Sequence, residues 1–310
     1  MTDLKITTSV APYVTFANAH EAIRFAHEDG FAGVEFNEDH LHRLLRIRPK
    51  APLSIKEYSR DRRMTNSLHK SLHRPSIDSP NQRERRKAID YTLRTIDLME
   101  AAEIPRIILH SFSDLPDFFR LRQERADKTA YYLGLHAVRT YGYLAPILKV
   151  HRRARAATLE SNFMSSLSEI VKYASEKKVH GEAIQVVFEE HYSDSIDYDR
   201  IPYGKGKFSN LIRGIDTAHQ LIRTKKNSEL SDQTDPIHFH AVDTNGRIDD
   251  HRTIGTGKVN FLPSLSSIAS AKLTATLVLE DGTRKSALES KDMLLALIKR
   301  ASLIKSSIPD

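Results

Sequence analysis

Short apolar stretches of β-type residues alternate along this chain with segments of helical periodicity, and this alternation limits the possible folds more than any other feature. Alternating strands and helices are typical of a parallel α/β fold. A barrel of eight such units needs about 250 residues, so a chain of 310 residues accommodates one barrel with insertions. The eight predicted strands are Lys5–Val10, Gly33–Phe36, Asn66–His73, Arg106–Phe112, Ile184–Glu190, Arg213–Asp216, Ile237–Val242 and Thr274–Glu280.

The segments between these strands place apolar residues at helical spacing. In Arg83–Ala102, for example, Ile89, Leu93, Ile96 and Met99 fall on one side of a helix. Similar patterns occupy Ala19–Glu28, Phe163–Ala174 and Ser286–Leu303. We therefore predict an α/β fold, a (β/α)8 TIM barrel, in which residues 1–310 form a single domain.

One connection is too long for a plain barrel. About 70 residues separate the fourth and fifth predicted strands, roughly twice what a barrel segment needs. The surplus, residues 113–160, contains several tyrosines and includes the basic stretch Lys149–Arg155. We predict a basic helical insertion within the domain that lies over the C-terminal ends of the strands. Its basic stretch is either a solvated helix face or an anion-binding lid.

The composition excludes several classes of protein. Without cysteine the chain has no disulfide framework, thiolate metal site or cysteine nucleophile. We see no apolar stretch approaching about 18 residues and no signal region at the start, so we expect a cytoplasmic protein with no membrane partner. The net charge of +7 favours polyanions such as nucleic acid or sugar phosphates, although many lysine- and arginine-rich enzymes bind neither.

Polar residues that can bind metals end most of the predicted strands. Because the C-terminal ends of all strands in a barrel face one mouth, these side chains should converge on one site. A single apolar stretch ending in histidine means little, but six such stretches indicate a metal site. Imidazole and carboxylate groups together suit Zn²⁺, Mn²⁺, Co²⁺ or Fe²⁺. The six residues are His73, His110, Glu189, Asp216, His240 and Glu280.

Two local motifs strengthen this interpretation. Asp216-Thr-Ala-His219 places a carboxylate at a strand end and an imidazole three residues later, in the first turn that follows. Asp249-Asp-His251 places two candidate ligands two residues apart, so that both can face one centre. The glycines of the following Arg-Thr-Ile-Gly-Thr-Gly stretch allow a tight backbone path beside them.

These motifs resemble a known superfamily. The segment from His240 to Gly257 and the Asp216-Thr-Ala-His219 motif are similar to segments shared by xylose isomerase-like TIM barrels, namely the sugar phosphate isomerases/epimerases and endonuclease IV (AP endonuclease family 2). The resemblance covers nearly the whole chain apart from the insertion. It implies metal-binding glutamates on strands five and eight, at Glu189 and Glu280, and histidines on strands three and four, at His73 and His110.

The resemblance also implies two possible ligand sets. Single-metal sugar isomerases use a core of four ligands for Mn, Co, Mg or Zn, which here would be Glu189, Asp216, His240 and Glu280. Endonuclease IV holds up to three zinc ions with a larger set, which here would add His73, His110, His219, Asp249 and His251. In the single-metal enzymes such additional positions often contact substrate, which would apply to His73, His219 and His251. A homo-oligomer is a further expectation that rests on the resemblance alone.

Two reactions follow from these ligand sets. In a sugar or sugar-phosphate isomerase or epimerase, the metal polarises a carbonyl while Glu189 and Glu280 remove and return a carbon proton as the catalytic residues. In an endonuclease that cleaves DNA at abasic sites, a metal-activated hydroxide attacks the phosphodiester. The complete set of nine ligand types and the basic charge favour the second reaction.

Departures from endonuclease IV favour the isomerase. The residues after His73 lack the aromatic side chain that this family uses at DNA, and Asp250 stands where the family has an arginine. The early Gly33-Val-Glu-Phe36 resembles the Gly-hydrophobic-Glu of sugar isomerases. Among the remaining histidines, we interpret His69 as a structural residue deeper in the barrel. His238 is either a buried structural residue or a support for a neighbouring ligand.

Overall fold

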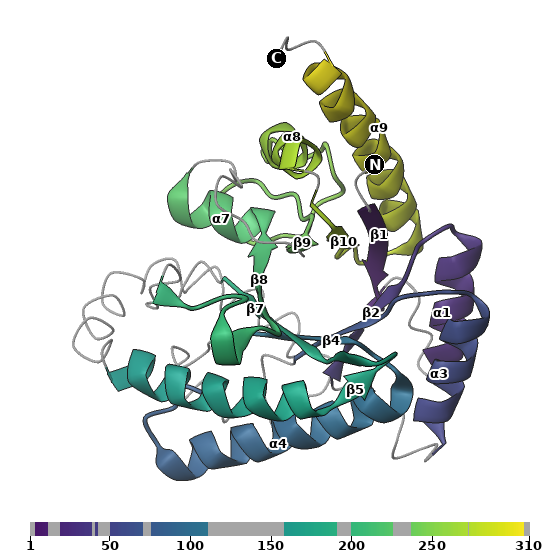
Figure 1. Cartoon of the computed structure of the whole chain (residues 1–310). Coiled ribbons are helices and arrows are strands. Elements are labelled where there is room, and N and C mark those ends of the chain that lie inside the picture. The colour runs from purple at the N-terminus through teal and green to yellow at the C-terminus, as the bar shows by residue number, and fades with distance from the viewer. Residues whose placement is uncertain are drawn as a thin grey trace, which may run out of the picture.

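The computed structural model describes residues 4–11, 19–38, 41–42, 50–70, 76–110, 158–190, 200–225, 237–271 and 273–306. Within these residues, eight parallel strands close into a barrel in the order β1-β10-β9-β8-β7-β4-β3-β2 (Figure 1). This closed barrel confirms the predicted fold class. The strands are β1 (Leu4–Ser9), β2 (Val34–Asn37), β3 (Ser67–His69), β4 (Arg106–Leu109), β7 (Gln185–Glu189), β8 (Leu211–Asp216), β9 (Ile237–His240) and β10 (Ala275–Leu279).

Helices surround the barrel on its outside (Figure 1). They are α1 (Ala19–Glu28), α3 (Ala51–Asp61), α4 (Gln82–Ala102), residues 158–176, α7 (Thr217–Thr224), α8 (Leu262–Ala271) and α9 (Arg284–Ser306). Local signals explain where they begin: Asn81 caps α4 by accepting from the backbone N–H groups of Arg83 and Glu84, and Pro52 lies in the first turn of α3. None of the described helices has the length and apolar character needed to cross a membrane.

Several observed elements differ from the predicted ones: β4 ends at Leu109 where Phe112 was predicted, and β9 ends at His240 where Val242 was predicted. β3 ends at His69, four residues before the predicted end, and His73 lies outside the described residues. A two-stranded antiparallel hairpin, β5 (Lys178–Val179) and β6 (Glu182–Ala183), precedes β7 and was not predicted. Its two-residue turn, His180-Gly181, has positive φ at both positions, as tight hairpins require. Most of the predicted insertion, residues 113–157, also lies outside the described residues.

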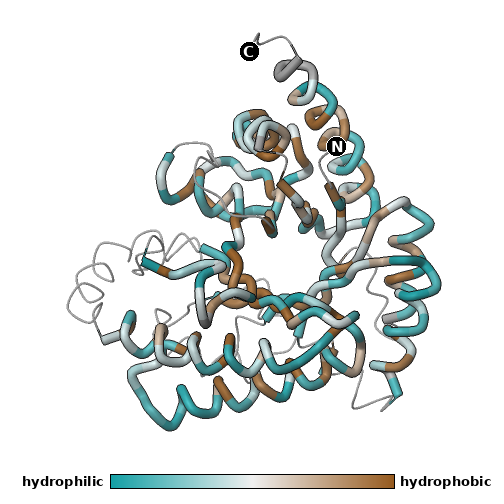
Figure 2. Tube along the Cα trace, viewed as in Figure 1, coloured by the Kyte–Doolittle hydropathy of each residue, from teal (hydrophilic) through white to brown (hydrophobic). Residues whose placement is uncertain are grey.

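Successive strand residues alternate between the helix layer and the barrel interior. In β7 the side chain of Phe188 packs outward against Phe163 of the 158–176 helix, with ring centroids 4.5 Å apart. Its neighbour Val187 instead joins Ile108 and Ile212 in a separate small apolar cluster, which we place inside the barrel. The strands are accordingly rich in hydrophobic residues, while the helices alternate hydrophobic and hydrophilic positions (Figure 2).

The same alternation places polar side chains above that interior cluster. Two residues beyond Ile108, Val187 and Ile212 come His110, Glu189 and Gly214, which therefore face the interior at the C-terminal end of the barrel. Parallel pairing sets Glu189 beside Gly214 and Asp216 beside His240. The barrel thus brings polar residues from distant parts of the chain to one level of its interior.

Candidate metal centre

Three strand-end residues form the centre of the candidate site. One ligand atom each from Glu189, Asp216 and His240 lies within 4.8 Å of the other two, and all three residues are buried. His240 Nδ1 is 2.9 Å from Glu189 Oε2 and 3.7 Å from Oε1 of Glu280, which directly follows β10. We name Glu189, Asp216, His240 and Glu280 the core group; three of its members come from β7, β8 and β9 and the fourth from the end of β10.

A second group shares Glu189 with the core group. The Nε2 atoms of His69 and His110 are 2.9 Å apart, and they lie 3.7 Å and 3.6 Å from Glu189 Oε2. These three residues are likewise close enough to share an ion, with one ligand atom of each within 4.8 Å of the others. His69 was interpreted from the sequence as structural and deeper in the barrel. The depth needs correction, because β3 ends at His69 and its Nε2 lies 3.7 Å from Glu189 Oε2 at the C-terminal end of the barrel.

A third group lies toward the rim. His219, in the first turn of α7, has Nε2 3.2 Å from Asp249 Oδ2, and His251 Nε2 is 3.3 Å from the same oxygen. His251 Nδ1 is 3.6 Å from Glu280 Oε2, which links this group to the core group. The His251 side chain is 40% exposed, whereas that of His219 is 9% exposed, so His251 faces the solvent side of the mouth.

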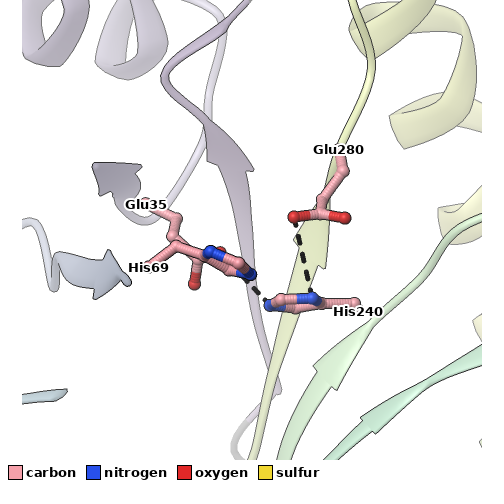
Figure 3. Close-up of side chains that lie close together, drawn as sticks. All are labelled: Glu35, His69, His240 and Glu280. Carbon is pink, nitrogen blue, oxygen red and sulfur yellow. Dashed lines mark ion pairs between the residues drawn. The ribbon is translucent and has the colours of Figure 1, made fainter. Parts of the chain in front are cut away.

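A fourth arrangement includes a residue that the sequence interpretation did not select. Glu35 on β2 lies with His69, His240 and Glu280 so that one ligand atom of each is within 4.8 Å of the others. In Figure 3, dashed lines join His240 to Glu280 and to Glu35, and His69 lies beside Glu35. The Gly-hydrophobic-Glu motif at residues 33–36 was the available signal, because Glu35 is an acidic residue in an otherwise apolar strand.

A buried carboxylate organises the loop that carries the third group. Asp243 accepts hydrogen bonds from the backbone N–H groups of Thr244, Gly255, Gly257 and Val259 at 2.8–3.0 Å. A Cβ atom at Gly257 would lie 2.2 Å from Asp243 Oδ1, so only glycine fits there. Asp243 thereby ties both ends of the segment containing Asp249 and His251 to the end of β9.

A second buried carboxylate fixes the backbone beside Glu189. Glu190 accepts a hydrogen bond from Arg213 Nε at 2.5 Å and one from Arg223 at 2.7 Å. Its own carbonyl oxygen lies 3.0 Å from His219 Nδ1. Pairing with two guanidinium groups compensates the burial of this charge, and it holds the strand end that presents Glu189.

Burial and mutual charge shift the pKa values of the core group. Burial raises the pKa of Asp216 to about 7, and the nearby charges of Asp249 and Glu189 act in the same direction. Burial opposes a charge on His240, but Glu189 and Glu280 raise its pKa well above the usual value. In the metal-free state, protons thus balance the converging carboxylates, and a bound cation would replace them.

The surrounding histidines divide into two kinds. Burial lowers the pKa of His110 to about 3 and that of His238 to about 4, so both rings are neutral near pH 7. Burial also opposes a charge on His251, but Asp249 and Glu280 raise its pKa to about 10. A neutral ring is the form that binds a metal directly, whereas a protonated one must first release its proton.

The residues present fit a divalent cation. Five buried atoms in the cluster make no hydrogen bond to the residues that the structure describes: Glu35 Oε1, Glu189 Oε2, His240 Nδ1, His240 Nε2 and Asp249 Oδ1. Buried polar atoms without partners are costly. A cation among Glu189, Asp216 and His240 would supply the missing interaction for Glu189 Oε2 and His240 Nδ1, and one imidazole with two carboxylates is a donor set that suits zinc, manganese or cobalt.

The comparison with protein families agrees with this architecture. Residues 23–300 match the family described as xylose isomerase-like TIM barrel. The chain belongs to this family. A comparison with curated protein sequences finds no significant match.

Solved structures share the fold of this xylose isomerase-like barrel. A D-tagatose 3-epimerase-like protein has 17% sequence identity and a TM-score of 0.67, with 98% of this chain and 100% of that chain covered. The 3-keto-D-glucoside 4-epimerase from E. coli has 15% identity and a TM-score of 0.63, with 95% and 100% covered. A Thermus thermophilus protein soaked with zinc chloride has 18% identity and a TM-score of 0.57, with 96% and 98% covered. At such identities the likeness concerns the fold.

The structure brings together every candidate ligand of this xylose isomerase-like barrel except one. His73 lies outside the described residues, so its role as a ligand or substrate contact stays a prediction. His69 and Glu35 are added to the cluster by the structure. The residues predicted from the sequence that lie together in the described part of the chain are His110, Glu189, Asp216, His219, His240, Asp249, His251 and Glu280.

Proposed function

We propose that this chain is a divalent-metal-dependent enzyme that isomerises or epimerises a sugar or a sugar phosphate by proton transfer. The observation that carries the proposal is the approach of two carboxylates to His240 Nδ1, Glu189 at 2.9 Å and Glu280 at 3.7 Å. Two carboxylates beside one candidate metal position suit the removal and return of a carbon proton. Solved structures with this fold include 3-keto-D-glucoside 4-epimerase and L-ribulose 3-epimerase, which supports a sugar substrate.

In this proposal the core group holds the metal. When bound, a divalent cation acts as a Lewis acid that polarises a substrate carbonyl and stabilises the negative charge that develops on its oxygen. Glu189 and Glu280 exchange the proton at the neighbouring carbon. His219 and His251 lie toward the rim, where their ring N–H groups would orient substrate hydroxyls; His73 has the same proposed role.

A second candidate function is metal-dependent cleavage of DNA at abasic sites. It is favoured by one specific observation, which is that the core group is flanked by two further groups with metal-ligand chemistry. Those are His69, His110 and Glu189 on one side and His219, Asp249 and His251 on the other. Several adjacent ions can activate a water molecule and stabilise the leaving oxygen of a phosphodiester.

Isotope exchange separates the two reactions. The protein, loaded in turn with Mn²⁺, Co²⁺ and Zn²⁺, is incubated in D2O with a panel of ketoses, aldoses and their phosphates, and deuterium at the carbon next to the carbonyl is measured by mass spectrometry. We expect exchange with at least one sugar and no nicking of abasic-site DNA. Robust nicking without exchange on any sugar would replace the proposed function with the nuclease.

The Glu280→Gln variant tests the role of the second carboxylate. It keeps the size of the side chain and one oxygen donor but cannot accept the proton, so exchange should be lost while metal is largely retained. Glu57→Gln, on the exposed side of α3, is the control and should leave exchange unchanged. Wild-type exchange in Glu280→Gln would remove Glu280 from proton transfer.

A further inference from the structure

The buried Glu35 carboxylate has neighbours that differ between its two oxygens. Oε2 accepts a hydrogen bond from Ser67 Oγ at 2.8 Å and lies 3.0 Å from His238 Nε2. Oε1 makes no hydrogen bond to the described residues, but it lies 3.2 Å from His240 Nε2. One oxygen is therefore anchored from below by β3 and β9, and the other points at a residue of the core group.

His240 presents opposite ring nitrogens to two different partners. Nδ1 faces Glu189 and Glu280, on the side where the core group would hold a metal, while Nε2 faces Glu35. Figure 3 shows the ion-pair contacts of His240 with Glu280 and Glu35. Nε2 also makes no hydrogen bond to the described residues. Its distance of 3.2 Å from Glu35 Oε1 is that of an ion pair, but the angles are not those of a hydrogen bond. An imidazole that binds a metal through one nitrogen carries its proton on the other, and that N–H needs an acceptor.

We propose that Glu35 is a positioning residue that accepts the Nε2 proton of His240 and so directs Nδ1 toward the metal, with Ser67 and His238 holding Glu35 in place. Such an acceptor selects one tautomer of the imidazole and fixes the plane of its ring. Ser67 and His238 already use Oε2, which leaves Oε1 as the atom that His240 needs. The proposal rests on the proposed metal site and not on the reaction that the site performs.

Glu35 as a direct metal ligand is the alternative to this role. It belongs to a group of four residues close enough to share an ion. The contact of Oε1 with His240 Nε2 at 3.2 Å argues against it, because an ion bound by Oε1 would take this oxygen from the Nε2 proton, while Ser67 and His238 already use Oε2. The two roles differ in what they predict for metal stoichiometry, and the test uses that difference.

The test measures metal binding by the metal-free protein. Zn²⁺ and Co²⁺ are titrated by calorimetry into wild type, Glu35→Gln and Glu35→Ala. We expect unchanged stoichiometry, with the dissociation constant raised about tenfold in Glu35→Gln and up to about 100-fold in Glu35→Ala. Glu38→Gln is the matched control, because Glu38 is also buried near the end of β2 but accepts from Thr95 of α4 instead; its dissociation constant should stay within about twofold of wild type.

A second measurement reports the tautomer of His240 directly. In ¹⁵N-histidine-labelled protein, the His240 resonances, assigned by their loss in His240→Gln, should show a protonated Nε2 and a metal-bound Nδ1 in the zinc-loaded wild type. In Glu35→Ala the Nε2 proton should lose its hydrogen-bond shift and exchange faster with solvent. A purely structural Glu35 would lower thermal stability without moving either signal.

Three results would overturn the proposal. Wild-type affinity with an unchanged His240 tautomer in Glu35→Ala would show that Glu35 does not position the ring. Loss of one metal equivalent per chain would make Glu35 a ligand. A wild-type protein that takes up no divalent ion would remove both the metal site and this role, whereas one that binds metal but turns over no sugar would remove only the proposed reaction. If Glu35→Ala does not fold, Glu35→Gln and Ser67→Ala carry the same test.

Discussion

Gly214 on β8 and Glu189 on β7 lie side by side in the barrel interior, so close that a Cβ atom at Gly214 would be 3.0 Å from the Cα and 3.1 Å from the Cβ of Glu189. The same Cβ atom would lie 2.7 Å from Val187 Cγ1. The absence of a side chain at position 214 thus leaves the space that Glu189 needs in order to reach His240.

Gly214→Ala should therefore disturb the core group. The added methyl group has to displace either the backbone of β7 or the Glu189 side chain, so we expect a loss of about 1–3 kcal/mol in the free energy of unfolding and weaker metal binding. Urea unfolding and metal titration measure the two effects. Gly282→Ala is the control, because a Cβ atom there meets nothing within 4 Å. Equal stability and affinity in Gly214→Ala and wild type would contradict the steric argument.

Asp243→Ala should loosen the loop that carries Asp249 and His251. It removes the acceptor of four backbone N–H groups in a buried position, which should cost at least about 2 kcal/mol of stability. Hydrogen exchange should become faster in residues 244–259 and change little in β7 and β8. Asp292→Asn, exposed on α9, should change neither quantity. A loop that stays protected in Asp243→Ala would show that other contacts hold it.

Metal affinity should fall as the pH is lowered. Asp216 binds a cation only when ionised, and burial raises its pKa to about 7. The apparent dissociation constant should consequently be about tenfold higher at pH 6 than at pH 8 from this group alone, since each pH unit below the pKa costs a factor of about ten. Calorimetric titration with Co²⁺ at several pH values measures this dependence. A constant affinity between pH 6 and 8 would contradict it.

The same shift predicts how the metal-free protein responds to pH. The pKa of Asp216 is higher in the folded protein than the ordinary value of 3.8, so the folded state binds more protons between these two values. Stability should then decrease as the pH rises from about 4 through 7, and Asp216→Asn should remove that part of the decrease. Urea unfolding of both proteins at pH 5 and pH 8 tests the sign.

Metal removal should lower thermal stability. A ligand at 100 times its dissociation constant stabilises the folded state by about 2.7 kcal/mol. For a chain of this size such a change raises Tm by roughly 4 °C. Calorimetric scans with chelator and with added Zn²⁺ measure the difference. The Glu189→Ala variant, which lacks a residue shared by two of the candidate groups, should lose most of it.

Much of the fold follows from local patterns of apolar and polar residues in the sequence. The apolar stretches around Ile107, Val187 and Phe239 are too short for helices and alternate with amphipathic segments, which predicts parallel strands. Residue boundaries were less predictable. β3 was expected to continue to His73 because Leu72 extends the apolar pattern, but its pairing with β4 reaches only as far as His69 and Ile108.

The choice between His69 and His73 shows where reasoning from the sequence stops. Four residues apart, the two side chains have the same orientation on an extended strand, so periodicity cannot distinguish them. The end of β3 places His69 at the level of the candidate site, and that end depends on hydrogen bonds to β2 and β4, which are distant in sequence. Glu35 was missed for a similar reason, because its partners His238 and His240 lie more than 200 residues away.

The sequence by itself determined the barrel and the common level of Glu189, Asp216, His240 and Glu280, because strands of one direction must present their C-terminal residues at one end. The tertiary structure decided the register between neighbouring strands. This register places Glu189 beside Gly214, which has no side chain, and the closed barrel brings Glu35 to Nε2 of His240. Periodicity specifies only which face of a strand a residue occupies. Closure of the barrel specifies the height of that residue along the barrel axis and the residues beside it on neighbouring strands. Both depend on the packing of all eight strands together.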